Sequence, residues 1–343
     1  MHKAHNFLLH LIIILFLTAF FTQVFDRYIS LGNIFTNKDD LRVYLSLVNS
    51  QINAVSAEPS NKVYLKVEVK NKNGLELPGI KVLLSIDNNN GSIYPQNSIT
   101  DKSGECIAVY TPPYYYSPSY KNEPFANITV KVAATEVSNS LKIKLLPVPV
   151  VLIHGYQQNS DIFDNMREYL EQKGFICSAI DYDSSLGISY AANKLEDFLG
   201  KQKELFLQQG FLVKRFTLIT HSMGGLVARY YTSSESYIKN EDVNKIIFLS
   251  VPHKGSYLAS IGENYFNDKS MEDLIPESKI FTTSFSNMIN KGLNSSIQVG
   301  NILSQYDEVV TAESGSLEEW SLETEIFNLG ENNFTVDNIL SGS

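Results

Sequence analysis

The residues best suited to chemistry in this chain surround Ser222, within the stretch FTLITHSMGGLVA at residues 216–228. Its first five residues, FTLIT, predict a buried strand, and residues 224–231 suit a helix. A serine at a sharp turn from strand to helix is exposed above the sheet, and the N–H of the next residue, here Met223, points at the oxygen of the reacting carbon. Thr220 replaces the first glycine of the G-x-S-x-G spacing, whereas Gly224 is in place. The stretch predicts a nucleophilic serine.

The elements that must position Ser222 alternate between strand and helix patterns from residue 147 onward. Residues 150–153 form a continuous apolar run, typical of a strand buried on both faces. Further strands are predicted at residues 175–181, 216–220, 245–250, 297–303 and 324–329, and helices at residues 161–173, 190–209 and 224–231. This alternation predicts a doubly wound, mostly parallel sheet that binds ligands at the carboxyl ends of its strands.

Four segments carry a resemblance to a known family. They read PVVLIHGY, LITHSMGGLVARYY, IIFLSVPHKGSYLA and LIPESKIFTTSFSN. Together they resemble a small bacterial triacylglycerol lipase of the α/β-hydrolase fold, over roughly residues 148–330. The resemblance implies a lipase or esterase, and it implies that residues 256–290 include a segment covering the acyl pocket. Ordinary surface helices are the alternative for that segment.

The resemblance assigns roles to further residues. The backbone N–H groups of Tyr156 and Met223 are expected to form the oxyanion hole, which stabilises the charge that develops on the ester oxygen. The acid should follow a later strand, because this fold has the chain order serine, acid, histidine. Asp307 stands after the strand predicted at residues 297–303, so we expect it to orient the histidine. Glu308 is the fallback.

The histidine that should complete this set is absent. It is expected beyond residue 329, but no histidine follows His253. Asn333 occupies the expected place, with Asn332 as a weaker candidate, and asparagine cannot accept and return a proton. We expect His154, His221 and His253 to be structural. Three explanations of the missing histidine remain open. The chain is a degraded or truncated copy, or it is an altered, inactivated version, or His253 or another residue supplies the base through an unusual geometry, which is the least favoured of the three.

Residues 41–146 follow a different pattern, with period-two alternation and regular turns. Residues 63–70 alternate apolar and polar side chains, as a half-buried strand should. Several such strands without a helical stretch predict a β-sandwich. The segments NKNGLELPGIKVLLS, NGSI and TDKSGECIAVYT resemble a bacterial Ig-like domain of the invasin and intimin type, which implies a spacer or adhesion module. The tyrosine-rich and proline-rich residues 111–120 predict a surface loop, either self-packed or able to contact a cell-surface polymer.

The N-terminus is apolar almost without interruption from Phe7 to Phe21. About 15 residues fit the core of an export signal better than a full membrane span, which needs about 20. No small-x-small cleavage site follows closely, so we favour an uncleaved membrane anchor over a removed signal. We therefore expect a signal or anchor segment at residues 1–25, a linker at 26–40, the Ig-like domain at 41–146 and the hydrolase domain at 147–343, all on the cell surface or secreted.

Composition excludes several other classes of function. The formal net charge is −9, and no basic block suggests a nucleic-acid partner. Cys106 and Cys177 fall in different predicted domains, so reduced thiols are expected. No cluster of cysteine and histidine predicts a metal site, and no cofactor is indicated.

Three hypotheses about function remain. The preferred one is a surface-anchored carboxylic-ester hydrolase acting on lipid or other acyl esters through Ser222. The second is a catalytically silent, hydrolase-like binding protein tethered by its Ig-like domain. The third is an adhesion or structural surface protein in which the hydrolase domain is secondary. The absent histidine favours the second hypothesis, and the intact serine turn favours the first.

Overall fold

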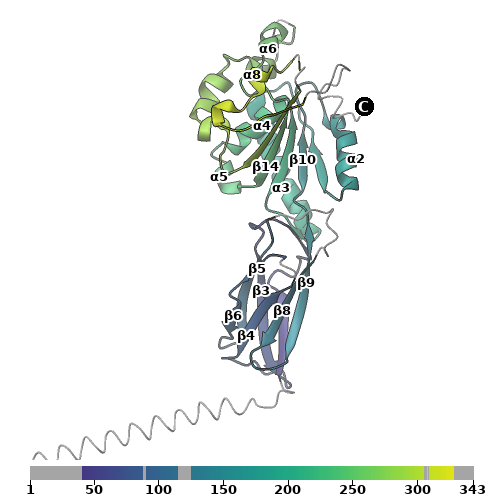
Figure 1. Cartoon of the computed structure of the whole chain (residues 1–343), viewed down its shortest axis with the longest axis vertical. Coiled ribbons are helices and arrows are strands. Elements are labelled where there is room, and N and C mark those ends of the chain that lie inside the picture. Colours follow the sequence, from purple (N-terminus) through teal and green to yellow (C-terminus); the bar gives the residue numbers. More distant parts are fainter. Residues whose placement is uncertain are drawn as a thin grey trace, which may run out of the picture.

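The protein consists of a β-sandwich and an α/β domain that follow one another along the long axis (Figure 1). The computed structural model describes residues 41–87, 90–114, 125–263, 265–304, 307 and 309–327. The expected anchor and linker, residues 115–120 of the tyrosine-rich loop, Glu308, Asn332 and Asn333 all lie outside these ranges. Within the ranges given, no helix combines the length and the apolar character that a membrane crossing requires.

The N-terminal domain is a two-sheet sandwich, which confirms the predicted Ig-like fold. Its buried residues alternate along each strand and meet in one apolar cluster between the sheets. One sheet has the order β1 (Leu41–Leu47), β3 (Val63–Asn71), β7 (Glu105–Thr111) and β5 (Ser92–Tyr94). The other contains β2 (Ala54–Ser56), β9 (Ser138–Leu146), β8 (Phe125–Val132), β4 (Lys81–Ile86) and β6 (Asn97–Ile99).

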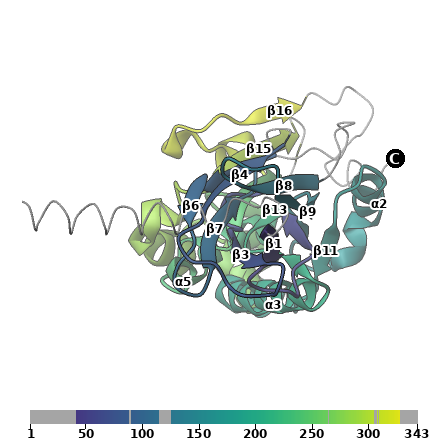
Figure 2. The ribbon, with the colours of Figure 1, turned by 90° about the horizontal axis from the view of Figure 1, so that it is seen from below.

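The second domain is built on a six-stranded sheet in which every paired neighbour is parallel. This confirms the predicted doubly wound α/β-hydrolase fold. The strand order is β11 (Cys177–Ile180), β10 (Val150–Ile153), β13 (Phe216–His221), β14 (Val243–Leu249), β15 (Gln298–Ser304) and β16 (Glu325–Phe327). Strands β15 and β16 form the edge remote from β11 (Figure 2).

Helices cover both faces of this sheet. On one face, η2 (Ser160–Phe163) and α2 (Asp164–Gln172) pack against β10 and β11. On the other, α3 (Ile188–Gln208) and α4 (Met223–Thr232) enclose the larger core. The remaining short helices are α5 (Tyr237–Asn240), α6 (Tyr257–Gly262), α7 (Lys269–Leu274), η3 (Ile280–Phe285), η4 (Ile289–Gly292), α8 (Ala312–Gly315) and η5 (Glu318–Trp320).

A short strand that the sequence analysis missed joins the two domains. Strand β12 (Phe211–Leu212), between α3 and β13, pairs in parallel with β2 of the sandwich. It thereby becomes the sixth strand of the second sandwich sheet. Side chains alternate across this seam, because Ala54 packs into the hydrolase core while Val55 packs into the sandwich core. The two domains therefore share a sheet and their cores meet there.

Polar contacts reinforce the seam. The Gly210 carbonyl accepts hydrogen bonds from the N–H groups of Asn53 at 2.8 Å and Ala54 at 3.1 Å. The buried Asn61 side chain accepts a hydrogen bond from the Lys214 N–H at 2.8 Å. Arg215 Nη1 lies 3.6 Å from Glu58 Oε1, whose side chain is almost fully buried. Because buried polar groups that lose a partner are costly, these contacts favour a single arrangement of the two domains.

A pair of glycine substitutions tests the seam. Gly210 has a φ of +78°, and an added Cβ would lie 2.6 Å from Asn53 Nδ2 and 2.7 Å from the Gln51 carbonyl oxygen. We expect Gly210→Ala to lower the free energy of unfolding by about 2 kcal/mol, because the left-handed backbone alone costs an L-residue about 1–2 kcal/mol. The measurement is urea unfolding followed by circular dichroism.

Gly200 provides the matched control. It lies in α3, and an added Cβ would meet no atom within 4 Å. Gly200→Ala should therefore raise the free energy of unfolding by roughly 0.5–1 kcal/mol. Equal effects of the two substitutions would contradict a tightly packed seam.

Candidate active site

Ser222 occupies a strained turn between β13 and α4. Its backbone has φ 49° and ψ −128°, a conformation that costs a non-glycine residue of order 1–3 kcal/mol. The Ser222 N–H donates to the Leu249 carbonyl at the end of β14, at 3.0 Å. The Gly225 N–H in turn donates to the Ser222 carbonyl, at 3.0 Å. The strand, the sharp turn and the helix thus match the arrangement expected around residue 222.

Glycines allow the start of α4 to approach its neighbours closely. A Cβ on Gly224 would lie 2.5 Å from the carbonyl oxygens of both Ile153 and His154, at the end of β10. A Cβ on Gly225 would lie 2.2 Å from a Val251 methyl group. No side chain larger than hydrogen fits at either position without displacing backbone or packed core. The glycines of the motif are therefore required by packing at the turn.

The turn after β10 lies directly against Ser222. A Cβ on Gly155 would be 2.9 Å from Ser222 Cβ. The N–H of Tyr156, the next residue, has no hydrogen-bond partner among the described residues, and the same holds for the N–H of Met223. The Met223 amide belongs to the first turn of a helix, where N–H groups lack intrahelical acceptors. Two unpaired amides thus flank the turn that carries Ser222, as an oxyanion hole requires.

Gln158 holds these two turns together, a role that the sequence analysis missed. Its Oε1 atom accepts a hydrogen bond from the Gly155 N–H at 3.1 Å and contacts His221 Nδ1 at 2.9 Å. One side-chain oxygen therefore joins the turn after β10 to the last residue of β13. A glutamine three residues after a glycine has no distinctive sequence signal, because its partner His221 is 63 residues away.

The side chain of Tyr156 connects the same turn to the segment that precedes α7. Its hydroxyl donates to Asp268 Oδ2 and receives a hydrogen bond from Gln157 Nε2 at 3.3 Å. Phe266 packs edge-on against the Tyr156 ring, with 6.5 Å between centroids. Burial, with Asp268 beside the hydroxyl, raises the pKa of Tyr156 to about 12. The tyrosine is thus a neutral hydrogen-bond donor that fixes residues 266–268 against the turn after β10.

Asp307 follows the carboxyl end of β15, and Ser222 follows the carboxyl end of β13. Because these strands are parallel, both residues lie on the same side of the sheet. Its Oδ1 atom accepts hydrogen bonds from the N–H groups of Val309 at 3.0 Å and Val310 at 2.9 Å. These bonds orient the carboxylate within its own loop. No hydrogen bond joins Asp307 to Ser222 in the described part of the chain, and a histidine would have to stand between them.

His154 and His221 have structural surroundings. His154 is fully buried, stacks on the Tyr182 ring at 4.2 Å, and has its Nδ1 atom 2.9 Å from the Gly155 carbonyl. Burial lowers the pKa of His154. His221 is buried and contacts Gln158 through Nδ1. Both histidines support the turns around the serine.

His253 belongs to a buried network with Arg229 and Asn301. Arg229 Nη1 lies 3.3 Å from His253 Nδ1 and donates to the His253 carbonyl at 2.8 Å. His253 Nε2 lies 3.3 Å from Asn301 Oδ1 on β15. Burial, with the neighbouring Arg229 charge, holds the pKa of His253 well below its ordinary value. The histidine therefore links the helix after Ser222 to the strand before Asp307, with both ring nitrogens engaged.

Arg229 itself is a second residue whose importance the sequence did not reveal. It is buried between the rings of Phe285 and Trp320, with its guanidinium carbon 4.3 Å and 4.8 Å from their centroids. It also donates through Nε to the Gly292 carbonyl at 2.9 Å. Burial lowers the pKa of Arg229 to about 9. An arginine in an otherwise ordinary helix gives no signal of this role, because its partners come from distant segments.

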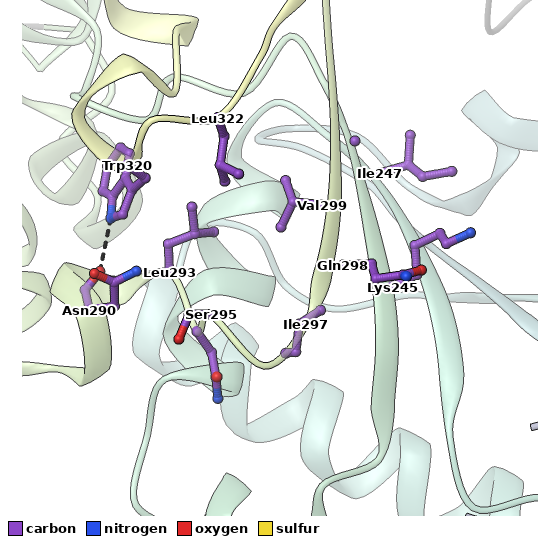
Figure 3. A pocket seen from close by; sticks show the side chains of 12 residues that line it. Lys245, Ile247, Asn290, Leu293, Ser295, Ile297, Gln298, Val299, Trp320 and Leu322 are labelled. Atoms are coloured by element: carbon purple, nitrogen blue, oxygen red, sulfur yellow. Dashed lines mark hydrogen bonds between the residues drawn. The ribbon is translucent and has the colours of Figure 1, made fainter. Parts of the chain in front are cut away.

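A separate groove of about 620 Å³ lies near the start of β14 and β15. Lys245, Gln298, Leu293, Leu322 and Trp320 are among the residues around it, and Trp320 Nε1 donates to the Asn290 carbonyl at 2.8 Å (Figure 3). The strands are parallel, and Ser222 follows the carboxyl end of β13. The groove therefore lies at the amino ends of the strands, on the side of the sheet opposite Ser222. It is not part of the site around the serine.

Comparison with known families matches residues 170–273 to the family described as the PGAP1-like alpha/beta domain. The matched segment contains Ser222 and covers less than half of the chain. Together with the six-stranded parallel sheet, the match confirms the α/β-hydrolase resemblance that the sequence motifs indicated. No curated protein matches the sequence.

Among solved structures, the mature lipase BlEst2 of Bacillus licheniformis is 17% identical, with 57% of this chain and 87% of that chain covered and a TM-score of 0.45. The phospholipase PlaB of Legionella pneumophila is 17% identical, with 46% and 39% covered and a TM-score of 0.36. The D00-D0 domain of intimin is 12% identical, with 32% and 48% covered and a TM-score of 0.26. The chain thus spans less than half of the phospholipase and of the intimin fragment.

Removal of the Gln158 acceptor should loosen the two turns around the serine. Gln158→Leu leaves the Gly155 N–H without its partner, and an unsatisfied buried donor costs about 1–3 kcal/mol. We expect the free energy of unfolding to fall by that amount in urea titrations. Gln158→Glu keeps an oxygen at this position and serves as the control. A leucine variant as stable as the wild type would contradict the role of Gln158.

The buried histidine network predicts a dependence of stability on pH. The folded state keeps His253 neutral, whereas the unfolded chain takes up a proton as pH falls below the ordinary pKa of 6.5. The free energy of unfolding should therefore fall on acidification from pH 7.5 to pH 5, by at most about 1.4 kcal/mol per pH unit for each such histidine. His154 acts in the same direction.

The check is urea unfolding across this pH range for the wild type and for His253→Gln. The variant cannot titrate at residue 253 and should lose less stability on acidification. Identical pH profiles for both proteins would show that His253 does not contribute.

Proposed function

We propose that the chain is an exported carboxylic-ester hydrolase of the lipase or esterase type, with Ser222 as nucleophile and acyl esters such as acylglycerols as substrates. The observation that carries the proposal is the strained backbone of Ser222 directly beside Gly155, with the unpaired amides of Tyr156 and Met223 next to it. Strain of this kind in a residue with a reactive hydroxyl is typical of a functional site. The choice of acylglycerols rests on the lipase-like sequence segments.

In this mechanism the Ser222 Oγ atom attacks the ester carbonyl carbon. The negative charge that develops on the carbonyl oxygen is stabilised by the Tyr156 and Met223 amides, and such a donor lowers the barrier by about 3–4 kcal/mol. The alcohol leaves, and water then releases the acid from the acyl-serine. Asp307 is the proposed acid. It follows the carboxyl end of its strand, as Ser222 does, and the N–H groups of Val309 and Val310 orient its carboxylate.

The base of this mechanism has no identified residue. The three histidines of the described domain are buried and engaged away from Ser222 Oγ, which makes no hydrogen bond to any described residue. Loss of the base from a serine triad lowers turnover by a factor on the order of 10⁶ and leaves roughly 10³ over water. We therefore expect the chain to be a slow esterase.

The same observation supports a second candidate function. A hydrolase-like domain that keeps the serine turn and the two amides but has no base can bind esters without cleaving them. In that case Asn333 takes the sequence position expected for the proton-accepting histidine, and the domain acts as a surface binding protein. The sequence of events at Ser222 then stops at substrate binding.

The arrangement of the chain fits a protein that works outside the cytoplasm. We propose that residues 1–25 form the signal or anchor, residues 26–40 a linker, residues 41–146 the Ig-like domain and residues 147–343 the hydrolase domain. In this arrangement the Ig-like domain lies between the anchor and the hydrolase domain in the sequence, and β1 begins at the end of the sandwich away from the β12 seam.

Hydrolysis of p-nitrophenyl esters by the purified full chain separates the two functions. For the esterase, the wild type should turn over slowly, and Ser222→Ala added to Asn333→His should abolish the rate gained by that change, because the catalysis that remains without a base comes from the oxyanion hole and binding and does not need the serine. Asn333→His should raise the wild-type rate at least about a hundredfold, because it restores a base.

Other outcomes assign the remaining hypotheses. Activity that appears only in Asn333→His supports the silent binding protein. If neither Ser222→Ala nor Asn333→His changes the rate of ester hydrolysis, and Ser222→Ala still supports adhesion of the cell surface, the protein is an adhesion protein. This result would contradict both proposals above.

A further inference from the structure

The outer face of the four-stranded sandwich sheet carries an exposed row of aromatic and aliphatic side chains. Tyr94 on β5 lies directly opposite Val109 on β7, and Val109 lies opposite Tyr64 on β3. Val48, just beyond β1, continues the row, since its N–H donates to the Tyr64 carbonyl at 2.9 Å. Tyr94 is 80% exposed and Tyr64 is 54% exposed. The row crosses β5, β7 and β3 and ends at the residue after β1, and no described element packs over its tyrosines.

The register sets the spacing of the two rings. Tyr94 and Tyr64 flank the same valine from either side, so they are two strand spacings apart, which is about 10 Å. Both side chains stand on the same face of the sheet, because residues directly opposite one another in antiparallel strands share a face. This spacing corresponds to two sugar units of an extended, β-linked polysaccharide, whose rings can stack their C–H faces on aromatic rings.

A strip of charged side chains borders the row along the strands. Lys66 lies 3.4 Å from Glu68 and 3.2 Å from Glu105, and Lys70 lies 3.4 Å from Glu68. These groups provide donors and acceptors for the hydroxyl edge of a sugar chain. The same carboxylates disfavour a lipid bilayer as the occupant, because charged groups are expensive to place in hydrocarbon.

We propose that this face of the Ig-like domain, defined by Tyr94, Val109, Tyr64 and Val48, binds an extended β-linked glycan chain that runs across the strands. The row lies at the end of the sandwich next to the hydrolase domain, because Asn53, five residues after Val48, donates to Gly210 at the seam (Figure 1). A glycan bound here holds the hydrolase domain against a polysaccharide-covered surface. This binding does not depend on the proposed ester hydrolysis.

The test uses the full chain in mild detergent, with insoluble cellulose and chitin as binding matrices and with cellohexaose and chitohexaose in calorimetry. Tyr64→Thr and Tyr94→Thr each remove one ring while keeping a residue that favours strands. We expect retention on at least one polymer, and a loss of affinity for its hexasaccharide of at least about fivefold in each variant. The double variant should not be retained.

Tyr44→Thr is the matched control on the same face. Tyr44 is 42% exposed and lies opposite Glu68, four residues along β3 from Tyr64, which is about 13 Å from the row. Its substitution should change affinity by less than about twofold. Thermal unfolding monitored by circular dichroism confirms that each variant is folded.

Several results would overturn the proposal. The first is that the full chain binds neither polymer and neither hexasaccharide. The second is that Tyr44→Thr loses as much affinity as Tyr64→Thr and Tyr94→Thr. Self-association in sedimentation experiments, or binding to anionic lipid vesicles, that Tyr64→Thr abolishes would assign the face to a second copy or to a membrane instead. Ester hydrolysis, present or absent, should be the same in all of these variants.

Discussion

The site around Ser222 depends on the close approach of two main-chain segments that end neighbouring parallel strands. The start of α4 lies against the carbonyl groups that end β10, at a distance that leaves no room for a side chain on Gly224. The turn after β10 in turn meets Ser222 at Gly155. Because this contact is between backbones, it places amide groups near the serine hydroxyl without using any side chain that could change rotamer. Gln158 and the bond between Tyr156 and Asp268 then secure the two turns.

The seam between the two domains also consists of contacts between main-chain segments. Pairing of β12 with β2 converts a connection inside the hydrolase domain into a strand of the sandwich. The sandwich is therefore a fixed support for the hydrolase domain. A binding face on the sandwich, such as the tyrosine row, belongs to the same domain as β2, the strand that pairs with β12 of the hydrolase domain.

The buried network of Arg229, His253 and Asn301 connects the elements that carry Ser222 and Asp307. An arginine charge is costly to bury, and here it is compensated by backbone carbonyls and by two aromatic rings. His253 accepts from this arginine and reaches β15 through Asn301. The network explains why a histidine near the sheet is unsuited to proton transfer at the serine. It holds α4 and β15 together in a chain in which no histidine follows residue 253.

The sequence by itself determined the two folds, the turn at Ser222 and the absence of a histidine after residue 253, because these features are set by local patterns. Apolar runs, period-two alternation and glycine spacing act within a few residues and can be read without coordinates. Only the tertiary structure decided the β12 seam, the role of Gln158, the enclosure of Arg229 and the row formed by Tyr64 and Tyr94. Each of these joins residues far apart in the chain, where a two-residue strand or a single polar side chain leaves no periodic signal. The reason is physical: such contacts form when whole elements pack, and their partners are chosen by the fold.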